Sequence, residues 1–138
     1  MGTVSTDTLT GSARTMTVWA GGLFAVVSAM HLLFFVGGSL DHLPDWVPGG
    51  PLWTSLSPGD TMGQPLAWFW LSVGSFAVPT LLLGLVLAGS ARQGRALPGY
   101  VTWTLAVWTV VAALMVLPSG LPVLVVASGL LVAARLRR

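Results

Sequence analysis

The sequence contains no cysteine, and this absence removes several classes of chemistry. Disulfide bonds, thiolate zinc sites, iron–sulfur clusters and cysteine nucleophiles all need a sulfhydryl group. The common sequence motifs of enzymes are missing as well, because there is no GxSxG, Walker loop, GxGxxG or HExxH. Hydrolase, nucleotide-hydrolase, dinucleotide-binding and zinc-protease functions therefore have no support, and we expect neither a cofactor nor a metal ion.

Charged residues are also scarce. They make up 7% of the 138 residues, whereas 54% are hydrophobic and the mean hydropathy is +0.85. A soluble domain usually carries about 25% charged residues to keep its surface solvated. Lysine and glutamate are absent, and the six arginines stand in small groups rather than on one basic face, which argues against nucleic-acid binding. The composition predicts that the lipid bilayer covers most of the surface.

Long apolar runs are what the sequence does have. A transmembrane helix needs roughly 20 consecutive apolar residues, and we predict helices at about 16–36, 66–88, 99–117 and 119–134. The fourth run is short unless Pro122 lies in the first turn of its helix. The first run also resembles a signal peptide, but it is longer than a typical signal core and no A-x-A cleavage site follows it. The predicted fold is all-α: a polytopic membrane protein whose four transmembrane helices form a bundle over residues 16–134.

Polar segments surround these runs. Residues 1–15 are rich in serine, threonine and glycine and are predicted to be a disordered cytoplasmic tail. Residues 37–65 contain five prolines and six glycines, so we expect a long outer loop rather than continuous helix. Residues 135–138 form a short arginine tail. Loops as long as the one at 37–65 are uncommon in compact folds and often functional.

The arginines predict the orientation of the chain. With four spans, all of them fall on one side of the membrane: Arg14, Arg92, Arg95, Arg135, Arg137 and Arg138. Cytoplasmic loops carry the excess of basic residues, so both termini are expected in the cytoplasm of a multi-pass inner-membrane protein.

Aromatic residues are expected at both membrane interfaces. In the four-span arrangement, Trp19, Tyr100 and Trp103 lie near the inner interface. Trp68 and Trp70 lie near the outer one. No ligand is needed to explain these five residues.

Two features bear on helix packing. Gly21, Ala25 and Ala29 repeat at a spacing of four, which predicts a face where another helix approaches closely. Pro79 lies midway along the second run and removes a backbone donor from the Ser75 carbonyl, so we expect a kink there. Nearby serine hydroxyls can satisfy the freed backbone groups.

His31 is the one ionisable side chain well inside a predicted span, which makes it a candidate for function. One interpretation is a neutral histidine that forms a hydrogen bond between helices. The other is a catalytic or ligand-orienting residue in a pocket lined by Ser28, Phe24 and Phe35. Trp108, near the middle of the third run, is either a core or lipid-facing residue or another wall of that pocket.

A D-H-x-x-D run formed by Asp41, His42 and Asp45 follows the first helix. It could fold back so that Asp41 or Asp45 orients His31, or it could be an ordinary solvated loop. As a metal site it is weak, because two histidines and nearby carboxylates show no recognised ligand spacing here.

The second half of the chain resembles a family of small four-helix bacterial membrane proteins known only as a domain of unknown function. The residues that carry the resemblance are His31, the aromatic segment 68–70, the arginine-bearing segment 92–98 and the Pro-Ser-Gly turn at 118–120. It covers most of residues 18–134. The resemblance implies the four-helix topology and brings no activity with it.

Three functions are compatible with these observations. The first is a non-enzymatic membrane protein that binds a partner protein or serves as an accessory component. The second is a membrane-embedded isomerase or cyclase for a lipophilic small molecule, in which His31 acts as acid and base with help from Asp41 or Asp45. The third is a transporter, which is disfavoured because no Asp or Glu lies in any apolar run.

Overall fold

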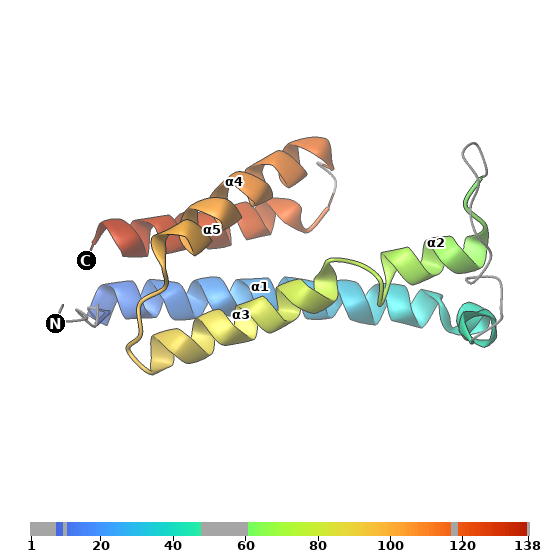
Figure 1. Ribbon diagram of the computed structural model, residues 1–138, viewed down its shortest axis with the longest axis horizontal. Coiled ribbons are helices and arrows are strands. Elements are labelled where there is room, and N and C mark those ends of the chain that lie inside the picture. The colour runs from blue at the N-terminus through green and yellow to red at the C-terminus, as the bar shows by residue number, and fades with distance from the viewer. Residues whose placement is uncertain (1–7, 10, 48–60, 117–118, 138) are drawn as a thin grey trace, which may run out of the picture. The chain divides into compact units, whose positions relative to one another are not determined.

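The computed structural model describes residues 8–9, 11–47, 61–116 and 119–137 of the chain (Figure 1). The described residues form helices and no strand, which confirms the all-α fold class. The elements are α1 (Gly11–Gly38), the 3-10 helix η1 (Leu40–Trp46), α2 (Gln64–Leu71), α3 (Ala77–Arg92), α4 (Gly99–Met115) and α5 (Leu121–Leu136). Among the described helices, α1 alone is both long and apolar enough to cross a membrane. Helices α3, α4 and α5 are apolar but shorter.

The chain divides into two compact units. Unit 1 consists of Met1–Val27 and Thr80–Arg138, and unit 2 of Ser28–Pro79. Unit 1 therefore holds the first half of α1, most of α3, and both α4 and α5. Unit 2 holds the second half of α1 with η1 and α2.

The predicted helix at 66–88 is wrong as a continuous element, because α2 ends at Leu71 and α3 begins at Ala77. The Ser72 hydroxyl turns back to the Trp68 carbonyl at 2.6 Å. The Ser75 hydroxyl accepts a hydrogen bond from the backbone N–H of Ala77 at 3.2 Å, as an N-terminal helix cap does. The break also moves Pro79 from mid-helix into the first turn of α3, where its missing N–H costs no helical hydrogen bond.

Other boundaries shift by smaller amounts. The first turn of α1 starts at Gly11, inside the predicted tail 1–15, and residues 1–7 and 10 of that tail lie outside the described residues. Within the predicted loop 37–65, Leu40–Trp46 form a 3-10 helix, while residues 48–60 lie outside the described residues. Pro122 does lie in the first turn of α5, as predicted.

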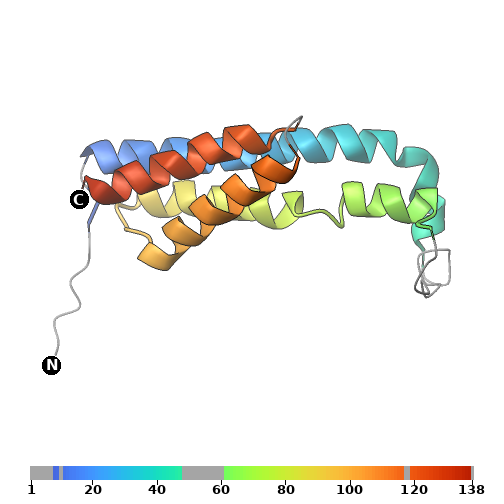
Figure 2. The same ribbon diagram turned by 90° about the horizontal axis from the view of Figure 1, so that it is seen from above.

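Unit 1 is held together by a backbone-to-backbone contact between α1 and α3, which run side by side in Figures 1 and 2. A Cβ atom built on Gly84 would lie 2.5 Å from the backbone nitrogen of Ala25 and 2.7 Å from the carbonyl oxygen of Gly21. A Cβ atom on Gly21 would lie 2.6 Å from the Gly84 carbonyl oxygen. The predicted close approach is therefore confirmed at Gly21 and Ala25, and Gly84 is its counterpart on α3.

Helices α4 and α5 pack against each other through a buried pair of hydroxyl groups. Thr109 and Ser128 lie with their hydroxyl oxygens 2.8 Å apart. Each hydroxyl is also within hydrogen-bond distance of a carbonyl in its own helix: Thr109 of Leu105 at 2.8 Å and Ser128 of Val125 at 3.0 Å. One hydroxyl thus donates across the interface while the other donates within its helix, so neither of these two buried hydroxyls is left unpaired.

The side chains buried in unit 1 are mostly small or hydroxyl-bearing, and many of its large apolar side chains are exposed. Five larger side chains complete the core: Phe24, Leu87, Leu105, Leu124 and Leu131. The small buried residues are Ala13, Thr17, Ala20, Thr80, Ala88, Ala91, Thr102, Thr109, Ala113, Ala127, Ser128 and Ala134. Exposed large apolar residues include Val26, Leu82, Leu85, Val86, Val107, Leu114, Met115 and Val126.

One end of unit 1 gathers the start of α1, the connection between α3 and α4, and the end of α5 (Figures 1 and 2). Gly94 follows α3 with φ +73°, the left-handed conformation that commonly ends a helix. Its carbonyl accepts a hydrogen bond from the N–H of Leu9 at 3.1 Å. The Arg14 guanidinium donates to the carbonyl of Arg92, the last residue of α3. A cation at this position satisfies a carbonyl that has no helical partner.

The contact at Gly84 generates a first prediction. Gly84→Ala places a methyl group against the backbone of α1, so the helices must separate, and we expect a loss of about 1–3 kcal/mol in the free energy of unfolding. The measurement is reversible unfolding in detergent micelles, followed by tryptophan fluorescence.

Gly89→Ala is the matched control in the same helix, because a Cβ atom there would meet nothing within 4 Å. It should leave stability unchanged or raise it by about 0.5–1 kcal/mol through helix propensity. Equal effects of the two substitutions would show that the helices do not approach closely at Gly84.

Candidate functional site around His31

His31 lies in the second half of α1 and is half-buried in unit 2. Its Nε2 atom is 2.9 Å from the carbonyl oxygen of Leu71. A carbonyl oxygen can only accept, so Nε2 carries the proton and donates it, which fixes the tautomer of a neutral ring. The face of the imidazole contacts Phe35, with ring centroids 4.5 Å apart and the planes tilted by 41°.

The Leu71 carbonyl is a specific kind of acceptor. Leu71 is the last residue of α2, and the final carbonyls of a helix have no partner within it. The chain does not continue as helix beyond this point, because Ser72 leaves helical geometry with φ −104° and ψ −109°. His31 therefore supplies a donor for the Leu71 carbonyl, which has no partner within α2 because the helix ends there.

The predicted carboxylate partners of His31 are not brought to it. Asp41 and Asp45 both lie in η1, and no hydrogen bond or ion pair connects either of them to His31 within the part of the chain that the structure describes. The Nε2 atom donates instead to the backbone of α2. A role for Asp41 or Asp45 in catalysis stays a prediction without a contact to support it.

Aromatic rings fill the space that the aspartates were expected to occupy. The ring centroids of Phe35 and Trp68 lie 6.3 Å apart. The His42 ring stacks on the Trp68 ring, with centroids 6.2 Å apart and an angle of 23° between the planes. A Cβ atom on Gly38 would lie 2.9 Å from the Trp68 ring, which is too close for a real contact. The backbone of α1 can therefore approach this indole only because residue 38 is a glycine.

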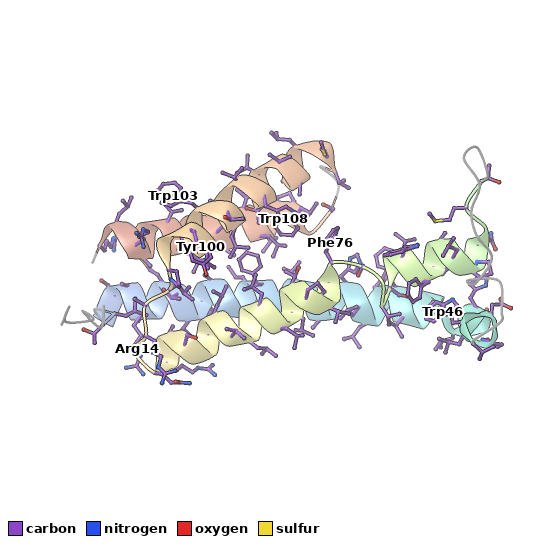
Figure 3. The ribbon with its side chains drawn as sticks, in the orientation of Figure 1. Arg14, Trp46, Phe76, Tyr100, Trp103 and Trp108 are labelled. Carbon is purple, nitrogen blue, oxygen red and sulfur yellow. The ribbon has the colours of Figure 1, made fainter. Side chains whose placement is uncertain are left out.

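Trp46 connects η1 to α2 in the same unit (Figure 3). Its indole N–H donates to the Pro65 carbonyl at 3.0 Å. Its ring meets Phe69 edge to face, with centroids 5.6 Å apart. Together with the Trp68 contacts, this bond holds the start of α2 in place, which in turn sets where Leu71 lies.

The predicted pocket residues are divided between the two units. Phe24 is fully buried in the core of unit 1 with Ala20 and Leu87, and Trp108 is partly buried against that same core. Ser28, which is 3% exposed, and Phe35 belong to unit 2. A pocket formed by these four residues stays a prediction.

Sequence reasoning missed the Leu71 carbonyl, Trp46 and Trp68 as parts of this site. Backbone acceptors leave no trace in a sequence. The signal that could have located the acceptor is the Ser72-to-Ser75 segment ahead of Pro79, which contains two hydroxyls and a glycine and favours a helix end.

Searches for similar proteins do not add to this geometry: no family model, curated protein or solved structure matches the chain. The described residues also contain no group of three or more His, Asp or Glu side chains placed to hold a metal ion. The resemblance noted from the sequence therefore stays a prediction, and the interpretation of this site rests on its own contacts.

The bond from His31 generates a second prediction. His31→Ala leaves the Leu71 carbonyl without its donor, and we expect unfolding to become easier by about 1–3 kcal/mol. His31→Gln keeps an N–H donor at similar reach and should recover at least half of that loss. Detergent unfolding followed by tryptophan fluorescence measures both variants.

The two variants distinguish structure from chemistry. A glutamine cannot exchange protons near neutral pH, so recovery of stability by His31→Gln would reflect hydrogen bonding alone. If His31→Gln is as unstable as His31→Ala, the bond to the Leu71 carbonyl does not stabilise the fold.

Proposed function

We propose that this chain is an integral membrane protein with four spans, formed by α1, by α2 with α3, by α4 and by α5, and that its role is non-enzymatic. It would act as a partner-binding or accessory component of the membrane. The observation that carries the proposal is the distribution of side chains in unit 1. Small and hydroxyl-bearing residues are buried there, while Leu82, Val107 and Leu114 are more than half exposed.

This distribution fits lipid better than water. Soluble monomers rarely expose contiguous apolar patches larger than a few hundred Å². In a bilayer, by contrast, lipid tails are as apolar as leucine, so helices associate through small residues and buried hydroxyl pairs. The Gly21–Gly84 contact and the Thr109–Ser128 pair are interactions of these two kinds.

The helix lengths are compatible with four spans. Helices α3, α4 and α5 contain 16 or 17 residues, which corresponds to about 24–26 Å against a hydrocarbon core of about 30 Å. Short spans are accommodated by local thinning of the bilayer. The break between α2 and α3 is compatible with a membrane as well, because His31, Ser72 and Ser75 form hydrogen bonds with its backbone.

A partner-binding role is supported by what the helices leave uncovered. At Gly22 of α1, Gly89 of α3 and Gly129 of α5, a Cβ would meet no described atom within 4 Å beyond the adjacent backbone of its own helix. Small residues are the positions at which neighbouring membrane helices approach most closely. His31, donating to a helix end, then serves stability rather than reaction.

A membrane-embedded isomerase or cyclase remains the second candidate, and one observation favours it. With Nε2 donating, the Nδ1 atom of His31 carries a lone pair and makes no hydrogen bond to any described residue. A neutral ring in this state can still take up a proton. This candidate requires His31→Gln to abolish function while leaving stability largely intact.

Cysteine labelling tests the four-span topology, and the absence of native cysteine makes each introduced thiol unique. We expect Thr61→Cys and Ser119→Cys to react with a membrane-impermeant maleimide in intact bacterial cells. Gln93→Cys and Arg137→Cys should react only after the cells are permeabilised, because positive loops stay in the cytoplasm.

The cysteine-free parent chain is the control for labelling of other proteins, and alkaline extraction of membranes checks integration. Labelling of Gln93→Cys in intact cells would contradict the orientation. Release of the parent chain by alkali would contradict the proposal as a whole.

A further inference from the structure

The cations of unit 1 gather at one end of it. This arginine end consists of Arg14, Arg92, Arg95, Arg135 and Arg137, which lie at the start of α1, around the α3–α4 connection and at the end of α5. No aspartate or glutamate occurs among the described residues of unit 1, and its one acidic residue in sequence, Asp7, lies outside them. The positive charge is therefore uncompensated within the described residues of unit 1.

Most of these guanidinium groups are available for another partner. Arg14 is engaged, because it donates to the Arg92 carbonyl. The side chains of Arg92, Arg95 and Arg135 make no hydrogen bond or ion pair with any residue that the structure describes. Arg92 and Arg95 are exposed, and Arg135 is half-buried with its guanidinium over the Cα atom of Gly99, at the start of α4.

Exposed amphipathic rings lie beside this end. Tyr100 and Trp103 lie in the first two turns of α4 and are 74% and 51% exposed (Figure 3). Trp19 on α1 is 66% exposed. Tyrosine and tryptophan prefer the headgroup level of a bilayer, where an apolar ring and a polar tip are both solvated. The rings therefore place the arginines at the depth of lipid phosphates.

We propose that the arginine end binds the phosphate headgroups of anionic phospholipids in the cytoplasmic leaflet, with Arg92, Arg95 and Arg135 as the main contacts. This inference rests on the proposed membrane topology. Guanidinium groups match phosphate oxygens with paired N–H donors, and juxtamembrane arginines are attracted to anionic lipid surfaces. A lipid is favoured over a soluble anion because the aromatic rings beside the cations offer apolar surface, which a free phosphate cannot use.

The experiment measures lipid selectivity of the full chain in nanodiscs made from equal amounts of phosphatidylglycerol and phosphatidylcholine. Lipids that stay bound after gentle release are counted by native mass spectrometry. We expect phosphatidylglycerol to be enriched over phosphatidylcholine. Each arginine contributes roughly a fivefold preference at low salt, so the triple variant Arg92→Gln, Arg95→Gln, Arg135→Gln should lose at least tenfold of the enrichment.

Three controls make the result specific. The triple lysine variant keeps the charge and should retain most of the enrichment, while Gln93→Ala changes the same loop without altering charge and should retain all of it. In the third control, inorganic phosphate and chloride are added at the same ionic strength. Phosphate should displace no more lipid than chloride does.

Equal binding of the two lipids by the parent chain would overturn the inference, and so would unchanged enrichment in the triple glutamine variant. Selective displacement by inorganic phosphate would identify a site for a free anion instead of a lipid. These failures are distinguishable from failure of the topology, because cysteine labelling and alkaline extraction report the spans independently of lipid selectivity.

Discussion

The close approach of α1 and α3 at Gly21 and Gly84 is the contact on which unit 1 depends. In a lipid environment, burying a leucine between helices gains little over leaving it among acyl chains, so association must come from close packing and polar pairs. Two glycines facing each other let the backbones touch, and a single Cβ atom on either would collide with peptide atoms. The small residues around them, Ala20 and Ala88, extend the same surface, while the large apolar side chains are left to face outward.

A second constraint concerns the end of α2 in unit 2. The last carbonyl groups of a helix have no partner within it, and in the proposed membrane they would have no water to satisfy them. The chain satisfies them locally through the hydroxyls of Ser72 and Ser75, and at longer range through His31. The histidine is therefore explained by its acceptor. An ionisable residue within a span is a functional candidate by default, but in this structure the Nε2 atom of His31 donates to the Leu71 carbonyl, which is a structural role.

The sequence predicted the helical class, the approximate extents of α1, α4 and α5, and the glycine face of α1, because all of these follow from hydropathy and residue size. It did not predict the end of α2. The apolar residues on both sides of the Ser72-to-Ser75 segment together have the length of one span, and the break depends on hydroxyl groups in that segment that compete for backbone partners. The sequence likewise pointed to Asp41 or Asp45 as the partner of His31 and not to the Leu71 carbonyl. A carboxylate can be found in a sequence, but a free carbonyl exists only after the chain has folded.

The ionisable side chains of different kinds are separated between the two units, and this separation bears on the function. All six arginines belong to the sequence of unit 1, whereas both histidines and three of the four aspartates belong to that of unit 2. An enzyme usually brings titratable groups of different kinds together so that their environments tune one another. Here the described histidines contact aromatic rings and a backbone carbonyl, and the described arginines lie at helix ends. In the proposed membrane topology, groups distributed in this way hold helices in place and contact lipid, so the proposed non-enzymatic role needs the fewest interactions beyond those that the structure contains.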